Sequence, residues 1–157
     1  MSATTATTGL RIEWAEVEAM LVAWQHVHNT IVPTAALSLP EIEERSRRNR
    51  LAVAYLSDVV VGCSTVRPPA AAASSAATVI ARVLPAHRGR GFGGQLYAHG
   101  LAEARRLGAD VIETCVLETN PEGLRFALGL GFVETERYLL PGDSVPFIDL
   151  GLVQRPL

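Results

Sequence analysis

A glycine-rich segment at residues 89–94 is the part of this sequence best suited to chemistry. Four of its six residues are glycine, and it lies between an apolar strand-like stretch at 78–84 and a helical pattern at 94–107. Glycine lets the backbone turn tightly and leaves its amide groups uncovered. At a helix N-terminus those amides and the helix dipole attract an anion. The segment therefore predicts a cradle for a phosphate or pyrophosphate, to which Arg88 and Arg90 add charge-assisted contacts.

Two common nucleotide-binding motifs fit this segment poorly. Residues 89–94 match the dinucleotide fingerprint G-x-G-x-x-G by letter, and Asp110 lies 21 residues after Gly89. In that fingerprint, however, the first glycine directly follows its strand, and the acidic residue closes the next strand. Here residues 85–88 intervene, and Asp110 precedes the strand-like segment at 111–117. A lysine-dependent phosphate loop is excluded because all 14 basic residues are arginine, so a dinucleotide-binding oxidoreductase is the least favoured class.

A second motif follows the strand-like segment at 111–117. Asn120 begins a short helical pattern at 121–129, and the pair Gly131-Phe132 follows it. Together with Arg88-Gly89-Arg90-Gly91-Phe92-Gly93, this ordered pair of motifs resembles the GCN5-related N-acetyltransferase (GNAT) superfamily. The pyrophosphate motif of that family is arginine or glutamine followed by x-x-G-x-G/A. The resemblance extends over about residues 78–140.

The resemblance implies a site between two splayed parallel strands, at 78–84 and 111–117, with acetyl-CoA between them. Backbone groups around Val83 and the side chain of Asn120 would bond the pantetheine arm. The implied reaction is transfer of an acetyl group from acetyl-CoA to a primary amine, directly, in a ternary complex. The remaining cofactor-binding residues would hold the pyrophosphate: Arg88, Gly89, Arg90, Gly91, Phe92, Gly93 and Gly94.

The catalytic groups depart from the family pattern. Many members have a tyrosine acid seven residues after the motif asparagine, and this chain has Ala127 there. The predicted catalytic residue is instead Glu113, which shares a strand face with Cys115 and whose apolar neighbours favour a raised pKa. Glu118 and Tyr138 are further candidates. Ala127 also keeps open a second function, a CoA-binding sensor or interaction module with little transferase activity.

Composition favours one globular domain over residues 1–157. With 48% hydrophobic residues the chain is unlike a disordered protein. Its net charge of −2 argues against an electrostatically driven nucleic-acid binder. The predicted class is α/β: a single mixed sheet of six to seven strands with flanking helices, of the acyl-CoA N-acyltransferase type. Helices are expected at 13–28, from residue 40, at 94–107 and at 121–129; strands at 51–56, 59–66, 78–84, 111–117 and 132–140, with a last edge strand at 147–153.

Cysteine usage and the termini predict a cytoplasmic protein. Cys63 and Cys115 lie far apart in apolar runs and are expected to be free thiols, which suits a reducing compartment. The first residues lack a secretory signal, and no apolar run reaches the ~18–20 residues that cross a bilayer. No metal is expected, because His26 and His28 point to different sides of a helix. His99 is expected to face solvent.

The predicted partner is a small-molecule or peptide amine, without nucleic acid or membrane. The sequence leaves the acceptor open among peptide N-termini, amino acids, polyamines and antibiotics. Acidic residues such as Asp58, Asp143 and Asp149 are candidates to attract its positive charge. A homodimer through the strand at 147–153 is also possible.

Overall fold

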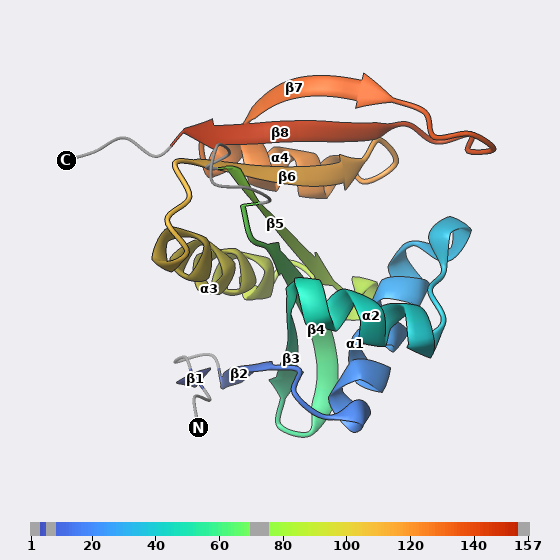
Figure 1. The fold of residues 1–157 in the computed structure, drawn as a ribbon, viewed down its shortest axis with the longest axis vertical. Coiled ribbons are helices and arrows are strands. Elements are labelled where there is room, and N and C mark those ends of the chain that lie inside the picture. The colour runs from blue at the N-terminus through green and yellow to red at the C-terminus, as the bar shows by residue number, and fades with distance from the viewer. Residues whose placement is uncertain (1–3, 6–8, 70–75, 154–157) are drawn as a thin grey trace.

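The protein folds around one mixed β-sheet with helices on both faces (Figure 1). The computed structural model describes residues 4–5, 9–69 and 76–153. The described strands are β1 (Thr4–Thr5), β2 (Leu10–Trp14), β3 (Arg50–Leu56), β4 (Val59–Arg67), β5 (Ala76–Val83), β6 (Val111–Leu117), β7 (Val133–Tyr138) and β8 (Phe147–Val153). The described helices are α1 (Glu18–Ile31), α2 (Leu39–Arg48), α3 (Phe92–Arg106) and α4 (Pro121–Gly129), with short 3-10 helices at Pro33–Ala35 and Pro85–His87.

The strand order is β1-β2-β3-β4-β5-β6-β8-β7. Neighbouring strands run antiparallel except β5 and β6, which are parallel. The predicted single mixed α/β sheet is confirmed, with the two-residue β1 added to seven longer strands. The predicted edge position of strand 147–153 is wrong. β8 pairs with β6 on one side and β7 on the other, and its Ile148 and Leu150 are fully buried.

The first helix begins later than its apolar periodicity predicts. α1 begins at Glu18 rather than at residue 13, because Trp14 belongs to β2 and pairs with Ala52 of β3. Val17 is the N-cap residue and is 57% exposed, so it is no part of the buried face. Backbone pairing with a strand distant in sequence therefore overrides the local helical pattern.

The sheet opens between β5 and β6. Three register pairs join these strands, ending at Thr78 and Glu113, and the strands then diverge toward their C-terminal ends. β4 continues beside β5 as far as Val83, whereas β8 follows β6 to Leu117. Figure 1 shows β6, β8 and β7 turned away from β4 and β5. The splayed parallel pair that the resemblance implies is thus present.

Helices cover the two faces of the sheet separately (Figure 1). α3 and α4 pack on one face, where Tyr97 and Ala127 join Val79 and Ile112 in a buried cluster. On the other face, α1 and α2 bury a second cluster against β3 and β4. α3 approaches β5 so closely that a Cβ atom on Gly100 would lie 2.5 Å from a methyl carbon of Val79. This packing fixes the start of α3 beside the end of β5.

Candidate functional site

A cleft of about 520 Å³ lies where β5 and β6 separate. Its walls come from the last residues of both strands, the glycine loop before α3 and the loop between β6 and α4. Thr30 and Ile31, at the C-terminal end of α1, also line it. Because the two strands share no ladder here, the backbone groups that face the gap are available to a ligand.

The glycine loop has the backbone geometry of an anion-binding turn. Gly89 and Gly91 have φ angles of 78° and 83°, in the left-handed region that other residues enter at a cost of about 1–2 kcal/mol. Gly91 is the N-cap of α3, and no side chain caps the helix or places an acid in its first turn. The first-turn amides of a helix lack intrahelical acceptors. Because the N-cap residue is a glycine, it has no side chain to occupy them, which suits a phosphate.

The other predicted loop residues hold the loop in place. Arg88 donates a hydrogen bond from Nε to the Val83 carbonyl oxygen at 2.9 Å, which joins the loop to the end of β5. Arg90 lies over the ring of Phe92, 5.0 Å from its centroid, and Phe92 is buried. Gly93 lies against Val83, and a Cβ atom on Gly94 would touch the Phe126 ring at 3.3 Å. Both arginines are exposed, and Arg88 lines the cleft, whereas Arg90 and Gly94 are not among its lining residues.

Asn120 lies on the opposite wall of the cleft. Its Oδ1 accepts a hydrogen bond from the Gly123 backbone amide at 3.0 Å and caps α4. Gly123 leaves room for this contact, because a Cβ atom there would lie 2.5 Å from Asn120 Nδ2. The motif asparagine therefore both begins α4 and lines the cleft.

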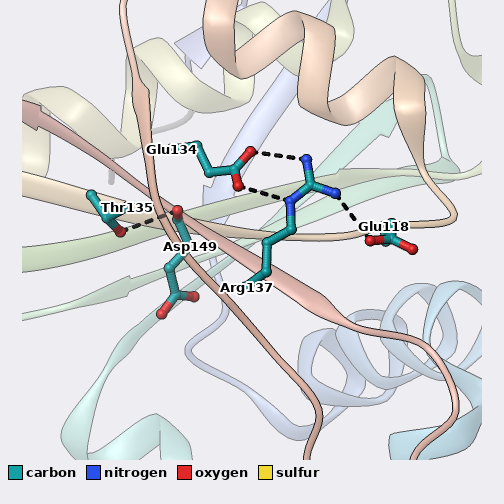
Figure 2. Close-up of polar contacts among 5 residues, drawn as sticks. All are labelled: Glu118, Glu134, Thr135, Arg137 and Asp149. Carbon is teal, nitrogen blue, oxygen red and sulfur yellow. Dashed lines mark hydrogen bonds and ion pairs between the residues drawn. The ribbon is translucent and has the colours of Figure 1, made fainter.

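The loop that carries Asn120 is tied to the edge strand β7. Figure 2 shows the Arg137 guanidinium between two carboxylates. It donates to Glu134 at 2.7 and 2.9 Å and to Glu118, in the β6–α4 loop, at 3.0 Å. Exposed ion pairs contribute little stability singly. The contact between Arg137 and Glu118 nevertheless joins the loop to β7.

The predicted catalytic residue Glu113 lies away from the cleft. It is exposed at the last β5–β6 register pair, and it is not among the lining residues. Cys115, two residues further along the same strand face, does line the cleft. Ala127 is fully buried in the core, so the usual tyrosine position holds no polar group.

Cys115, Asp149 and Tyr138, on β6, β8 and β7, form a cluster. The sequence did not predict that these three side chains lie together. Asp149 lies opposite Cys115 in the β6–β8 register, and Tyr138 Oη donates to Asp149 Oδ1 at 3.1 Å. Both side chains also influence the pKa of the Cys115 thiol. Burial, followed by the Asp149 charge, raises the pKa of Cys115 to about 11. Burial likewise raises the pKa of Tyr138, so both groups keep their protons at neutral pH.

Two further lining residues, Arg82 and Tyr97, were not predicted for the site. Arg82 projects from β5 into the cleft, and a single charge inside the apolar stretch 78–84 was a signal that could have identified it. Tyr97 comes from α3, and its hydroxyl lies 3.0 Å from the Thr114 hydroxyl. Its ring stacks on Phe126 at 5.7 Å. Tyr97 therefore fills the base of the opening between the strands.

The remaining residues that sequence reasoning singled out lie in packing positions. His99 is not a solvent-facing residue, because its ring lies 4.5 Å from that of Trp14. His28 is buried and stacks on Trp24 at 5.1 Å. Cys63 and Cys115 are both free thiols.

Neither a metal centre nor a membrane span is found in the part of the chain that the structure describes. No three His, Cys, Asp or Glu side chains among those residues come together as metal ligands would. No described helix combines the length and the apolar character needed to cross a bilayer.

The family comparison agrees with this geometry. The family model described as Acetyltransferase (GNAT) family matches residues 11–132. The chain belongs to the GNAT acetyltransferase family. A search of curated proteins found no match.

Solved GNAT-type structures are similar over nearly the whole chain. The Salmonella typhimurium protein yncA, solved with its cofactor acetyl-CoA, has a TM-score of 0.77 at 20% identity, with 94% of this chain and 95% of that chain covered. Ribosomal-protein-alanine N-acetyltransferase from Brucella melitensis has a TM-score of 0.74 at 21% identity, with 90% of this chain and 98% of that chain covered. Ard1 from Thermoplasma volcanium has a TM-score of 0.78 at 18% identity, with 94% of this chain and 99% of that chain covered. At these identities the likeness concerns the fold.

Proposed function

We propose that this GNAT family member transfers an acetyl group from acetyl-CoA to a primary amine, directly, in a ternary complex. The observation that carries the proposal is the cleft of about 520 Å³ between β5 and β6, with the glycine loop at its edge. Family membership over residues 11–132 supports the same reaction class. The free thiols of Cys63 and Cys115 suit the reducing cytoplasm, where we place the enzyme.

The residues present fit acetyl-CoA. The uncapped start of α3 and the left-handed Gly89 and Gly91 would hold the pyrophosphate, with Arg88 and Arg90 adding positive charge. The open strand edges near Val83 and the side chain of Asn120 would bond the pantetheine arm. The thioester would then lie deeper in the cleft, beside Cys115.

The reaction requires the amine and the thioester to be held together. The amine nitrogen bonds to the carbonyl carbon, the carbon–sulfur bond breaks, and a protonated amine releases two protons, of which one goes to the departing thiolate. Positioning the two reactants in one cleft supplies much of the acceleration. A backbone amide on an open strand edge can stabilise the negative charge that develops on the carbonyl oxygen.

Direct transfer is favoured over an acetyl-cysteine route. Cys115 is the cysteine that lines the cleft, and only a thiolate is an effective nucleophile. With a pKa of about 11, its sulfur is protonated at neutral pH. For the proton acceptor we favour Asp149, which does not line the cleft but lies opposite the lining residue Cys115. Glu113 is the alternative that the sequence predicts.

A CoA-binding module with little transferase activity is the second candidate. The buried Ala127 in the usual tyrosine position favours it. Turnover distinguishes the two candidates, because a sensor would bind acetyl-CoA without releasing free thiol when amines are supplied.

The first test is thermal unfolding with acetyl-CoA, CoA and NAD titrated separately. A ligand at 100 times its Kd stabilises a fold by about 2.7 kcal/mol, which raises the midpoint measurably. We expect a shift with both CoA species and none with NAD, followed by amine-dependent thiol release. No shift with acetyl-CoA would contradict both candidates, whereas a shift without thiol release would favour the sensor.

A further inference from the structure

Arg82 places a positive charge in the wall of the cleft. It lies on β5 opposite Cys63 of β4, and Cys63 is buried under α1. Its side chain therefore lies on the α1 face of the sheet, and it lines the cleft with Thr30 and Ile31. The hydrogen bonds and ion pairs found among residues 9–69 and 76–153 give its guanidinium no carboxylate partner.

The titratable groups around Arg82 do not offset its charge. His28 feels the positive charge of Arg82, and burial lowers the pKa of this histidine, so it is neutral at physiological pH. Burial raises the pKa of the neighbouring Cys63 to about 12, so this thiol also stays neutral. A partly buried charge without a partner is unfavourable. An anionic group of a ligand in the cleft would supply the missing charge.

A carboxylate, that of Asp149, lies next to the cleft residue Cys115, outside the cleft lining itself. Cys115 lines the cleft on β6, and Asp149 lies opposite it in the β6–β8 register. Figure 2 shows the Asp149 carboxylate pointing away from Arg137, whose guanidinium binds Glu118 and Glu134. The Asp149 backbone carbonyl accepts from Thr135, and its side chain accepts from Tyr138. Asp149 is half-buried, and its charge faces the same side of the sheet as Arg82.

We propose that the acceptor is a small amine that also carries a carboxylate, with Arg82 binding the carboxylate and Asp149 facing the ammonium group. The inference rests on the proposed acetyl transfer, because it names the acceptor class for that same cleft. The Arg82 guanidinium in the cleft wall and the Asp149 carboxylate beside Cys115 match the two charges of a zwitterion such as a free amino acid. A guanidinium is also the side chain that best binds a carboxylate, through two parallel hydrogen bonds.

The test compares amino acids with the amines that result from removing their α-carboxylates. Leucine is paired with isoamylamine and phenylalanine with phenethylamine, and the other common amino acids are treated alike. Thiol release gives kcat/KM for each member of a pair. We expect the preferred amino acid to exceed its amine roughly 10- to 100-fold, the range of a hydrogen-bonded charge pair.

Two variants test whether Arg82 causes this preference. Arg82→Gln should reduce the ratio of kcat/KM between the amino acid and its amine to within about threefold. Arg82→Lys, which keeps the charge, should retain part of the preference. Arg47→Gln is the matched control, because Arg47 is exposed on α2 and outside the cleft. Acetyl-CoA binding, measured by thermal unfolding, should be the same in all four proteins.

A second readout keeps this inference separate from the proposed function. Unfolding of the CoA-saturated protein is measured with each amino acid and each amine. An Arg82-dependent shift with amino acids but no thiol release would support the acceptor class and contradict the transferase. Equal turnover of amines and amino acids in the wild type would overturn the inference and leave the transferase standing. Loss of stability in Arg82→Gln with an unchanged preference would also overturn it, because Arg82 would then only support α1.

Discussion

Among single residues, Cys115 is the one whose protonation state its position in the cleft affects most strongly. Its pKa is raised from 9.0 to about 11, chiefly by burial, so its thiolate fraction near pH 8 is about a hundredfold lower than that of a free thiol. We expect iodoacetamide to label Cys115 about a hundredfold more slowly in the folded than in the unfolded protein. Mass spectrometry of the labelled peptides measures both rates. Equal rates would contradict the protonated thiol and reopen an acetyl-cysteine route.

Asp149 is expected to act on the amine and not on acetyl-CoA. Asp149→Asn removes the charge that faces the acceptor and should lower kcat/KM for the amine roughly 10- to 100-fold. KM for acetyl-CoA should stay unchanged. Asp110→Asn is the matched control, since Asp110 is exposed and precedes β6, at the end of that strand away from the cleft. If Glu113→Gln lowers the rate and Asp149→Asn does not, the sequence-based candidate is the proton acceptor.

Sequence reasoning predicted the turn of the glycine loop and the helix start at Asn120 because these features are local. A left-handed turn, a helix start and a helix cap are each encoded within a few neighbouring residues. Tyr138 and Asp149 were named singly, yet their contact with Cys115 depends on β8 lying between β6 and β7. That order, and the bulge in the β7–β8 ladder, arise from pairing between distant segments. No local pattern in the sequence specifies them.

At the level of elements, the packing of α3 on β5 determines where the glycine loop lies. Gly100→Ala would put a Cβ atom 2.5 Å from a Val79 methyl carbon, so the helix must shift. Overpacking of this kind costs about 1–3 kcal/mol of unfolding free energy. Chemical denaturation measures the loss, and acetyl-CoA affinity should fall with it because the loop moves with α3.

Gly129→Ala is the control for this change. Gly129 ends α4, and a Cβ atom there would meet nothing within 4 Å. Alanine is also the better helix former. We expect Gly129→Ala to leave the unfolding free energy unchanged or slightly higher. A similar loss in both variants would show that close packing of α3 is not the cause.

The residues at which helices begin were predictable where neighbouring residues supply a strong capping signal. α2 has a capping box between Ser38 and Glu41 with proline in its first turn, and its predicted start near residue 40 is confirmed. The start of α1 was wrong because Trp14 fits both an apolar helix face and a strand. Only the partner strand β3 decides between them, and periodicity cannot reveal a partner.

For the whole molecule, two packed histidines link stability to pH. Burial is the main cause that lowers the pKa of both His28 and His99 below 6.5. The charged groups acting on them are Arg82 and Arg45 for His28, and Glu103 and Arg50 for His99. The unfolded chain therefore binds protons below about pH 6.5 that the folded protein does not take up.

Unfolding free energy should thus be level above pH 6.5 and fall as the pH decreases below it. Carboxylates with lowered pKa, such as Glu103, contribute a separate loss only below their ordinary value of 4.5. Denaturation at pH 7.5, 6.5 and 5.5 isolates the histidine contribution. His28→Gln and His99→Gln should each flatten this slope, and a slope that neither variant changes would contradict the assignment.

The assembly of the molecule is constrained by its sheet order. The predicted homodimer through strand 147–153 cannot form by pairing at that strand, because both edges of β8 are occupied. The edge strand is β7, near which Val133, Leu139 and Leu140 are exposed. A homodimer stays a prediction, to be checked by sedimentation of the purified chain.

Direct transfer between two bound reactants is the central claim, and two-substrate steady-state kinetics test it most directly. Rates of thiol release are measured while acetyl-CoA is varied at several fixed concentrations of an accepted amine. A ternary complex predicts double-reciprocal lines that intersect, because both reactants must occupy the cleft together. Parallel lines, with an acetylated enzyme trapped when the amine is withheld, would contradict the account and make Cys115 the nucleophile.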